Sequence, residues 1–523
     1  MKNKLILLTL TLWATSCVKD LDRVPFIDVT SATVYNDPAN YRKILAKVYA
    51  GLAVSGQQGP AGKPDISGID EGFSTYLRQY WKAQELTTDE AVIGWNDGSL
   101  PDYHYMRWTS GNEFIAAMYN RLYYQITLCN EFIRETTDAK LASRNITGDN
   151  AIKAYRAETR FMRALSYYHA LDMFGSVPFV TEEDAVGSFL PRQASRIELF
   201  NYVESELKAI ENELVDPKKN EYGRADKAAA WALLAKLYLN AEVYTGMGRY
   251  NDAVTYCNKI ISSNAYTLDA EYQHLFLADN DKSTETIFSV TFDGTRTKTW
   301  GGMTFLVHAP VGGNMNPAVY GINGGWGGLR TTPQFVGLFP DVTGKTDRRA
   351  IFHTDGQKLD IDEIPTFTDG YAIGKYKNVT RAGVKGSDTE GNFPDNDFPL
   401  FRLADVYLTY AEAVLRGGTG GSTAQALTYI NALRNRAFKG TTGNITATQL
   451  TLDFILAERG RELYWEGHRR TDLIRYKKFV SGYNWAWKGG IKAGRDVSAH
   501  LALFPIPASD IVANPNLKQN TGY

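Results

Sequence analysis

Apolar positions along this chain recur mostly with the period of an α-helix, and residues 223–262 show the pattern most clearly. Small and apolar residues stand three or four positions apart on one stripe of the first half: Ala228, Ala232, Ala235, Leu239 and Val243. Two glycines, Gly246 and Gly248, end this predicted helix, and a second amphipathic helix begins near Tyr250. A helix pair of about 34 to 40 residues with alanine at its crossing positions is typical of tetratricopeptide repeats, which are stable only when stacked.

The same periodicity predicts helices on both sides of this pair. Asp37-Pro38 is a capping residue followed by a first-turn proline, so we expect a helix to begin there. Further helices are expected at 112–136, 149–174, 197–214, 401–418, 423–437 and 452–479. Residues 264–398 are glycine-rich and irregular, with one short predicted strand near Ile287. We therefore expect a mainly α fold, a tetratricopeptide-like helical-repeat scaffold with minor β structure, and an irregular loop-rich ligand-binding region at about 264–398.

The N-terminus has the parts of a secretion signal: two lysines, an apolar run at 5–12, and small residues directly before Cys17. The apolar run is too short to span a bilayer. The position of Cys17 resembles a bacterial lipobox, in which the thiol is acylated and becomes the first mature residue. Ordinary signal cleavage near Ser16 is the alternative. We accordingly divide the chain into a signal peptide at 1–16, a lipidated tether at 17–37 and one globular unit at 38–523.

Charge and cysteine content narrow the functional classes. The chain has 57 Lys and Arg against 58 Asp and Glu without a block of like charge, which argues against a nucleic-acid partner. Cys129 and Cys257 lie in helical patterns and are expected to be core residues rather than a disulfide. The histidines form no HExxH motif, so zinc catalysis is not expected.

Four segments resemble the signature sequences of one protein family. They are RFMRALSYYHALDMFGSVPF at 160–179, FRLADVYLTYAEA at 401–413, ERGRELYWEGHRRTDLIRY at 458–476 and FPIPASDIVANPNLKQNTGY at 504–523. Together with the Cys17 motif, they are similar to the SusD/RagB family of outer-membrane lipoproteins from Bacteroidetes. Loop segments at 54–73, 223–229 and 297–307 resemble the starch-binding founding member of that family, and loops normally diverge first.

This resemblance implies a non-enzymatic protein on the outer membrane, lipid-anchored and facing the extracellular side, that requires no cofactor. It implies a scaffold that carries a glycan site and sits as a lid on a SusC-type TonB-dependent transporter. The expected ligand is an α-glucan, either starch or malto-oligosaccharide. Dextran or another glycan stays open, because residues 303–328 depart most from the starch binder.

The resemblance also implies particular site residues. It places an aromatic arc that cradles the glycan on three tryptophans: Trp95, Trp300 and Trp326. Trp300 stands where the starch binder has a tyrosine. Polar helpers fall on Asp70 and Arg78, whereas the asparagine expected after the first tryptophan has no clear counterpart, and Asn96 and Asp97 are the nearest candidates.

Sugar binding by these residue types has a physical basis. Sugar rings present C–H faces that pack on aromatic rings while the hydroxyls stay free for hydrogen bonds. The three tryptophans of the arc lie in polar or glycine-rich segments, whereas Trp81, Trp231 and Trp465 lie in helical patterns and are expected in the core. The planar guanidinium of arginine holds its N–H groups in fixed positions, from which they can donate hydrogen bonds to sugar hydroxyls. A surface ion pair between Arg78 and Asp70 fits the sequence equally well.

Charged residues within the predicted helix at 452–479 stand three or four positions apart, and we expect them to form a structural salt-bridge network. They are Glu458, Arg459, Glu462, Glu466, Arg469, Arg470 and Asp472.

Two acidic clusters contain oxygen ligands suited to a hard cation. One contains Asp279 and Asp281, and the other contains Asp395 and Asp397. The first is not an EF-hand loop, since Thr284 replaces the turn glycine. The family resemblance suggests a structural calcium ion that bridges these two loops.

Two other functions remain compatible with the sequence. A glycoside hydrolase needs two carboxylates about 5 to 10 Å apart across the scissile bond, and no motif picks out such a pair. A protein-interaction scaffold without a small ligand is also compatible, because tetratricopeptide stacks commonly bind peptides.

Overall fold

The computed structural model describes residues 31–146, 148–187 and 189–523. The predicted signal peptide, Cys17 and most of the predicted tether lie outside these residues. Residues 31–37, which we expected in the tether, are folded. They begin with the short helix α2 (Ser31–Val34), and Tyr35 is buried with edge-on contacts to the rings of Tyr41 and Phe132. Aromatic packing therefore extends the folded part to the N-terminal side of Pro38.

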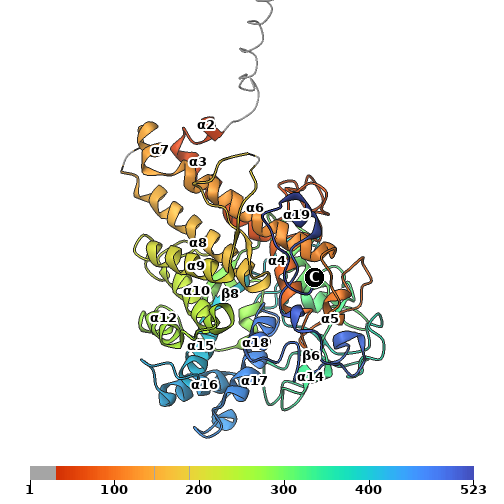
Figure 1. Cartoon of the computed structure of the whole chain (residues 1–523). Helices are drawn as coiled ribbons and strands as arrows, with labels where there is room; N and C mark the ends of the chain where they lie inside the picture. Colours follow the sequence, from red (N-terminus) through yellow and green to blue (C-terminus); the bar gives the residue numbers. More distant parts are fainter. Residues whose placement is uncertain (1–30, 147, 188) are drawn as a thin grey trace, which may run out of the picture.

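Helices dominate the fold, and most of the long ones follow one another down one side of the molecule (Figure 1). Consecutive members pack together: α8 contacts α6 and α9, and α12 contacts α10 and α15. This arrangement agrees with the predicted helical stack. The long helices are α3 (Pro38–Ala53), α6 (Glu113–Glu135), α8 (Asn150–Met173), α9 (Arg196–Ile210), α10 (Lys227–Leu239), α12 (Tyr250–Ser262), α15 (Leu403–Leu415), α16 (Thr423–Phe438) and α17 (Leu452–Leu463).

Side-chain caps explain why many of these helices begin where they do. In each case an oxygen of the capping side chain accepts a hydrogen bond from a backbone N–H of the first turn, which stabilises a helix by about 1 kcal/mol. The capping residues are Asp37 for α3, Asn112 for α6, Asp149 for α8, Ser195 for α9 and Asp226 for α10.

Helix α10 lies at the centre of the stack, with neighbours that include α9, α12 and α15. Its alanines are buried, as the crossing pattern predicts, and small side chains allow this close packing. One detail differs from the prediction, because α10 ends at Leu239 and the separate short helix α11 (Ala241–Thr245) continues to Gly246. Cys129 and Cys257 are free and buried, as expected.

Shorter elements lie on the other side of the molecule, together with much of the loop-rich region, green to teal in Figure 1. They include α4 (Tyr76–Glu85), α5 (Asp102–Tyr105), α13 (Gly302–His308), α14 (Pro333–Val336) and α19 (Ala508–Ala513), whereas α18 (Arg469–Arg475) contacts both α17 and α4. The remaining short helix, α7 (Asp138–Ser143), contacts α6. Short 3-10 turns lie at 272–276, 280–282, 317–320, 441–443, 488–490 and 499–502. Within the described residues, no helix is both long enough and apolar enough to cross a membrane.

Strands form four small antiparallel pairs in the described part of the chain. The predicted strand near Ile287 is β4 (Thr286–Val290), and its partner, which the periodicity did not predict, is β8 (Phe398–Arg402). The other pairs are β1 (Val92–Ile93) with β5 (Leu329–Arg330), β2 (Val177–Pro178) with β3 (Gln193–Ala194), and β6 (Phe352–His353) with β7 (Ala372–Ile373).

The prediction of one continuous helix over 452–479 is wrong, because the chain breaks between α17 and α18. Trp465 has φ 61° and Gly467 has φ 80°, which are left-handed conformations. Carboxylates from α4 and the turn after it occupy the break. Oε2 of Glu90 accepts a hydrogen bond from Trp465 N at 2.9 Å, and Oε1 of Glu85 accepts one from Gly467 N at 2.6 Å. These contacts replace the hydrogen bonds that a continuous helix would make.

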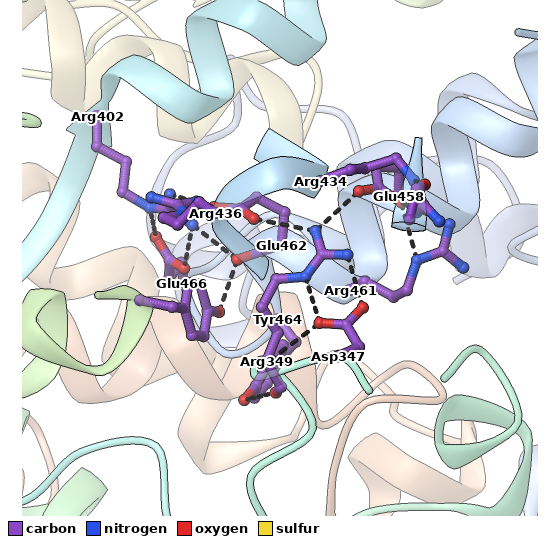
Figure 2. A network of polar contacts seen from close by, with 12 residues as sticks. Asp347, Arg349, Arg402, Arg434, Arg436, Glu458, Arg461, Glu462, Tyr464 and Glu466 are labelled. Atoms are coloured by element: carbon purple, nitrogen blue, oxygen red, sulfur yellow. Dashed lines mark hydrogen bonds and ion pairs between the residues drawn. The ribbon is translucent and has the colours of Figure 1, made fainter. Parts of the chain in front are cut away.

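The predicted salt-bridge network is present and buried (Figure 2). Its partners come largely from other segments rather than from one helix face. Glu462 accepts hydrogen bonds from Arg349 Nη1 at 3.1 Å and Arg402 Nη1 at 2.7 Å, and from Arg436. Arg459 binds Asp472 across the break at 2.7 Å. The network therefore joins β8, α16, α17, α18 and the loop at 347–349.

Candidate functional site

Pairing of β1 with β5 brings two of the predicted tryptophans together. Trp95 comes two positions after Ile93, the last residue of β1, and Trp326 comes three positions before β5. Gly94 N donates a hydrogen bond to Gly328 O at 2.9 Å, which continues the pairing beyond the strands. The ring centroids of Trp95 and Trp326 are 6.2 Å apart, and the Trp95 indole N–H donates to Trp326 O at 3.3 Å.

Trp300 completes the cluster from the turn before α13. Its ring centroid lies 6.4 Å from that of Trp326 and 5.1 Å from that of Phe393. All three tryptophans are half-buried. The three predicted residues thus form one continuous row with Trp326 in the middle, which we call the tryptophan arc.

Helix α13 supports this arc with two residues that the sequence analysis missed. Phe305 lies edge-on to Trp95 at 6.0 Å, and His308 stacks on Trp326 at 4.9 Å with an interplanar angle of 25°. Residues three apart on a helix share a face, so the F-x-x-H spacing was a usable signal. Burial lowers the pKa of His308, which keeps the imidazole neutral near pH 7.

Arg78 lies behind the arc rather than on the surface. Its Nη1 donates to the carbonyl oxygens of Gly72 and Trp300, each at 3.1 Å, and its guanidinium lies 4.4 Å from the Phe305 ring centroid. Burial lowers the pKa of Arg78 to about 10, and the charge of Asp97 opposes this shift. The alternative of a surface ion pair with Asp70 is wrong, because no such pair forms within the described chain. Arg78 holds the backbone that carries Trp300.

The other three predicted polar residues are exposed, and they have different neighbours. Oδ1 of Asp70 accepts a hydrogen bond from Phe73 N at 3.1 Å and so closes its own turn. Asp97 is near enough to Arg78 to affect its pKa. Asn96, by contrast, lines a cavity on which neither Trp300 nor Trp326 borders. The structure therefore brings Arg78, Asp70 and Asp97 to the Trp300 end of the arc. Asn96 lies away from that end, beside Trp95.

The side chain of Asn280 joins the two acidic clusters by hydrogen bonds to the backbone of Asp397. The side chain of Asn280 donates to Asp397 O at 2.8 Å and accepts from Asp397 N at 3.0 Å. Burial raises the pKa of Asp397 to about 7, and the charges of Asp281 and Asp395 add to the rise. No group of three or more His, Cys, Asp or Glu is arranged to hold a metal within the described ranges. These carboxylates fit a calcium ion only in part, because calcium takes six to eight oxygen ligands and backbone oxygens would have to complete the set.

Comparison with known proteins identifies the family. Residues 25–239 match a family described as "Starch-binding associating with outer membrane", and residues 362–523 match the SusD family. The "Starch-binding protein SusD" of Bacteroides thetaiotaomicron is 35% identical to this chain over an alignment that covers 97% of it and 96% of the relative. The chain belongs to the SusD family. The resemblance inferred from its signature segments is thereby confirmed.

Solved structures share the fold of this SusD-family protein. Surface glycan-binding protein A from Bacteroides fluxus superposes with a TM-score of 0.71 at 20% identity and covers 93% of this chain and 100% of its own. Surface glycan-binding protein A from Bacteroides thetaiotaomicron, solved in complex with laminarihexaose, has a TM-score of 0.68 at 20% identity over 92% of this chain and 99% of its own. The predicted mainly helical fold is thus confirmed.

Proposed function

We propose that this protein captures an α-glucan, starch or malto-oligosaccharide, on the tryptophan arc. The observation that carries the proposal is the row of half-buried rings of Trp95, Trp326 and Trp300, held 6.2 and 6.4 Å apart by their neighbours. Such a row offers apolar faces to the C–H faces of successive sugar rings. The relative of 35% identity that is named as a starch-binding protein supports the same ligand.

Calorimetry with a panel of glucans tests this function. Trp326 is central in the arc, so Trp326→Ala is expected to weaken malto-oligosaccharide binding by at least about 30-fold, or about 2 kcal/mol. Trp231→Ala is a matched control, since Trp231 is a half-buried tryptophan of α10 whose indole binds Glu211. Equal affinity of wild type and Trp326→Ala would refute the site.

A different glucan is the second candidate. A structure with the same fold was solved in complex with laminarihexaose, and loops between shared helices set ligand choice. Dextran and laminari-oligosaccharides therefore belong in the same panel. Preference for one of them over malto-oligosaccharide, with loss of binding in Trp326→Ala, would keep the arc and change the ligand.

We also propose that the protein acts without catalysis, as an extracellular lid on a SusC-type TonB-dependent transporter. We expect it to be anchored in the outer membrane through a lipid on Cys17, which lies outside the described residues. A Cys17→Ser variant is expected to leave the membrane fraction. Affinity purification of the native protein is expected to recover the transporter. Release of labelled products from a glucan would instead indicate a hydrolase.

A structural calcium ion between the acidic clusters is a further part of this proposal. The like charges that raise the pKa of Asp397 are the support for it, because a divalent cation would relieve their repulsion. Chelation is expected to lower the melting temperature, and added calcium is expected to restore it. Unchanged melting together with metal analysis that detects no calcium would rule the ion out.

A further inference from the structure

Trp95 belongs to the walls of two different sites. Besides its place in the arc, it lines a cavity of about 450 Å³, within the range of about 300 to 1,000 Å³ that is usual for ligand pockets. The other walls come from α5 and from the segments around Pro365 and Trp487. Asn96, the predicted helper without a place in the arc, also lines this cavity.

Aromatic rings form much of the cavity wall. Tyr105 and Trp487 meet edge-on with ring centroids 6.2 Å apart, and both are half-buried. The Trp487 indole N–H donates to Ile361 O at 2.9 Å, which fixes the orientation of the ring. With Trp95, the Trp487 ring offers an apolar face of the kind that the arc offers, whereas the guanidinium of Arg107 lies over the Tyr105 ring, 4.6 Å from its centroid.

His104 is the polar group that this cavity leaves unexplained. It is 1% exposed, and neither of its ring nitrogens has a hydrogen-bond partner among the residues that the structure describes. Burial without partners is costly for a polar group, so His104 has hydrogen-bonding capacity that a ligand in the cavity would use. Burial lowers the pKa of His104 to about 3, so the imidazole is neutral and has one donor and one acceptor.

The charges around the cavity favour a neutral ligand. None of the lining residues is an Asp or Glu. The lining cation Arg107 is already paired, because its Nε donates to Asp102 at 2.9 Å. A neutral imidazole matches hydroxyl groups, which both donate and accept hydrogen bonds, and the aromatic walls match C–H faces.

We propose that this cavity binds a further pyranose unit of the same glycan that lies on the tryptophan arc, with Trp95 as the shared wall. This inference rests on the proposed function and extends it. It makes the binding surface longer than three rings and gives Asn96 a role beside His104. Longer oligosaccharides gain contacts that shorter ones cannot make.

Calorimetry with maltotriose and maltoheptaose tests the cavity separately from the arc. His104→Leu and Trp487→Ala are expected to weaken maltoheptaose binding about tenfold more than they weaken maltotriose binding. His104→Leu is also expected to raise the melting temperature, because it removes a buried group without partners; a structural role for His104 predicts the opposite. If Trp487→Ala fails to fold, His104→Leu alone tests the proposal.

The outcomes separate the two proposals. If Trp326→Ala loses binding while both cavity variants bind maltoheptaose like wild type, the cavity proposal is wrong and the arc stands. If Trp326→Ala binds like wild type while the cavity variants lose binding, the arc is wrong, and so is the extension of the arc into the cavity; the cavity is then a glycan site of its own. If wild type binds neither these two sugars nor any other glucan of the panel, both are wrong.

Discussion

Gly328 allows the indole of Trp95 to lie directly against the backbone beside β5. A Cβ atom built at Gly328 would come within 2.5 Å of the Trp95 ring, closer than real Cβ contacts. Trp95 is also fixed by its hydrogen bond to Trp326 O and by Phe305. At this position glycine is needed for close approach rather than for a left-handed backbone.

Gly328→Ala is therefore expected to displace Trp95 and to weaken glycan binding about tenfold, or about 1.4 kcal/mol. The matched control is Gly324→Ala, because a Cβ at Gly324 meets nothing within 4 Å. Calorimetry measures both affinities. Equal affinities of the two variants would show that the position of Trp95 does not depend on Gly328.

At the residue scale, the sequence indicated the tryptophans of the arc but not the residues that hold them in place. The family resemblance pointed to Trp95, Trp300 and Trp326, and their polar, glycine-rich segments supported this assignment because such positions are unusual for core residues. Phe305 and His308 were missed, since a short helix in an irregular region gives no long periodic pattern. Arg78 was assigned to a surface role, because sequence does not reveal that backbone carbonyls surround its guanidinium.

The break between α17 and α18 is stabilised by two carboxyl groups that share a buried environment. Burial raises the pKa of Glu85 to about 7, and burial together with the charge of Glu85 raises that of Glu90. The folded protein therefore holds a proton here that the unfolded chain, with a glutamate pKa near 4.3, releases. Because the native state binds more protons, this pair makes stability fall as pH rises from about 4 to about 7.

Glu90→Gln is expected to remove this loss of stability with rising pH. The amide oxygen can still accept a hydrogen bond from Trp465 N, and the amide does not ionise. The slope of unfolding free energy against pH should differ from wild type by up to about 1.4 kcal/mol per unit between pH 4 and 7. Urea unfolding at several pH values measures the slope. Parallel slopes for variant and wild type would contradict the shared proton.

Glu462 is a central acceptor of the network in Figure 2, with Arg349, Arg402 and Arg436 around it. Removing one partner from a buried ion pair leaves uncompensated charge. Glu462→Gln is therefore expected to lower the free energy of unfolding by about 3 to 5 kcal/mol.

The control for this change is Glu221→Gln, which removes an exposed pair with Arg42 whose side chains are 55% and 65% exposed. An exposed pair is expected to contribute less than about 1 kcal/mol. Urea unfolding of both variants measures the difference. Similar losses would show that burial adds nothing to this network.

At the element scale, helix positions were predictable because apolar periodicity and capping residues agree, as at Asp37 and Asn112. There were exceptions: α4 was not predicted, and the long helix at 452–479 is broken. Its charged residues kept helical spacing across the break, and the groups that interrupt it, Glu85 and Glu90, lie about 375 residues away in sequence. Strand β8 was missed for a similar reason, since its partner β4 lies more than a hundred residues earlier.

On the scale of the whole molecule, the helical stack and the loop-rich region share one hydrophobic core. A single cluster of buried residues extends from Val48 in α3 to Leu517 near the C-terminus. The tryptophan arc therefore rests on a rigid body, and we expect little rearrangement when a ligand binds.

A preformed site makes ligand binding add to the stability of the whole fold. Malto-oligosaccharide at one hundred times its dissociation constant is expected to raise the free energy of unfolding by about 2.7 kcal/mol. A thermal melt should shift upward in wild type and much less in Trp326→Ala, in which binding that is about 30-fold weaker leaves at most about 0.9 kcal/mol of the added stability. An equal upward shift in both proteins would place the binding elsewhere.

Trp95 and Trp326 are 231 residues apart in the chain, and they meet only because β1 pairs with β5. Closing so long a loop costs chain entropy, so we expect the arc to form late in folding. Glycan affinity thus reports the integrity of the polypeptide. A protease cut between these tryptophans that lets the halves separate would abolish binding, although each fragment keeps its own ring.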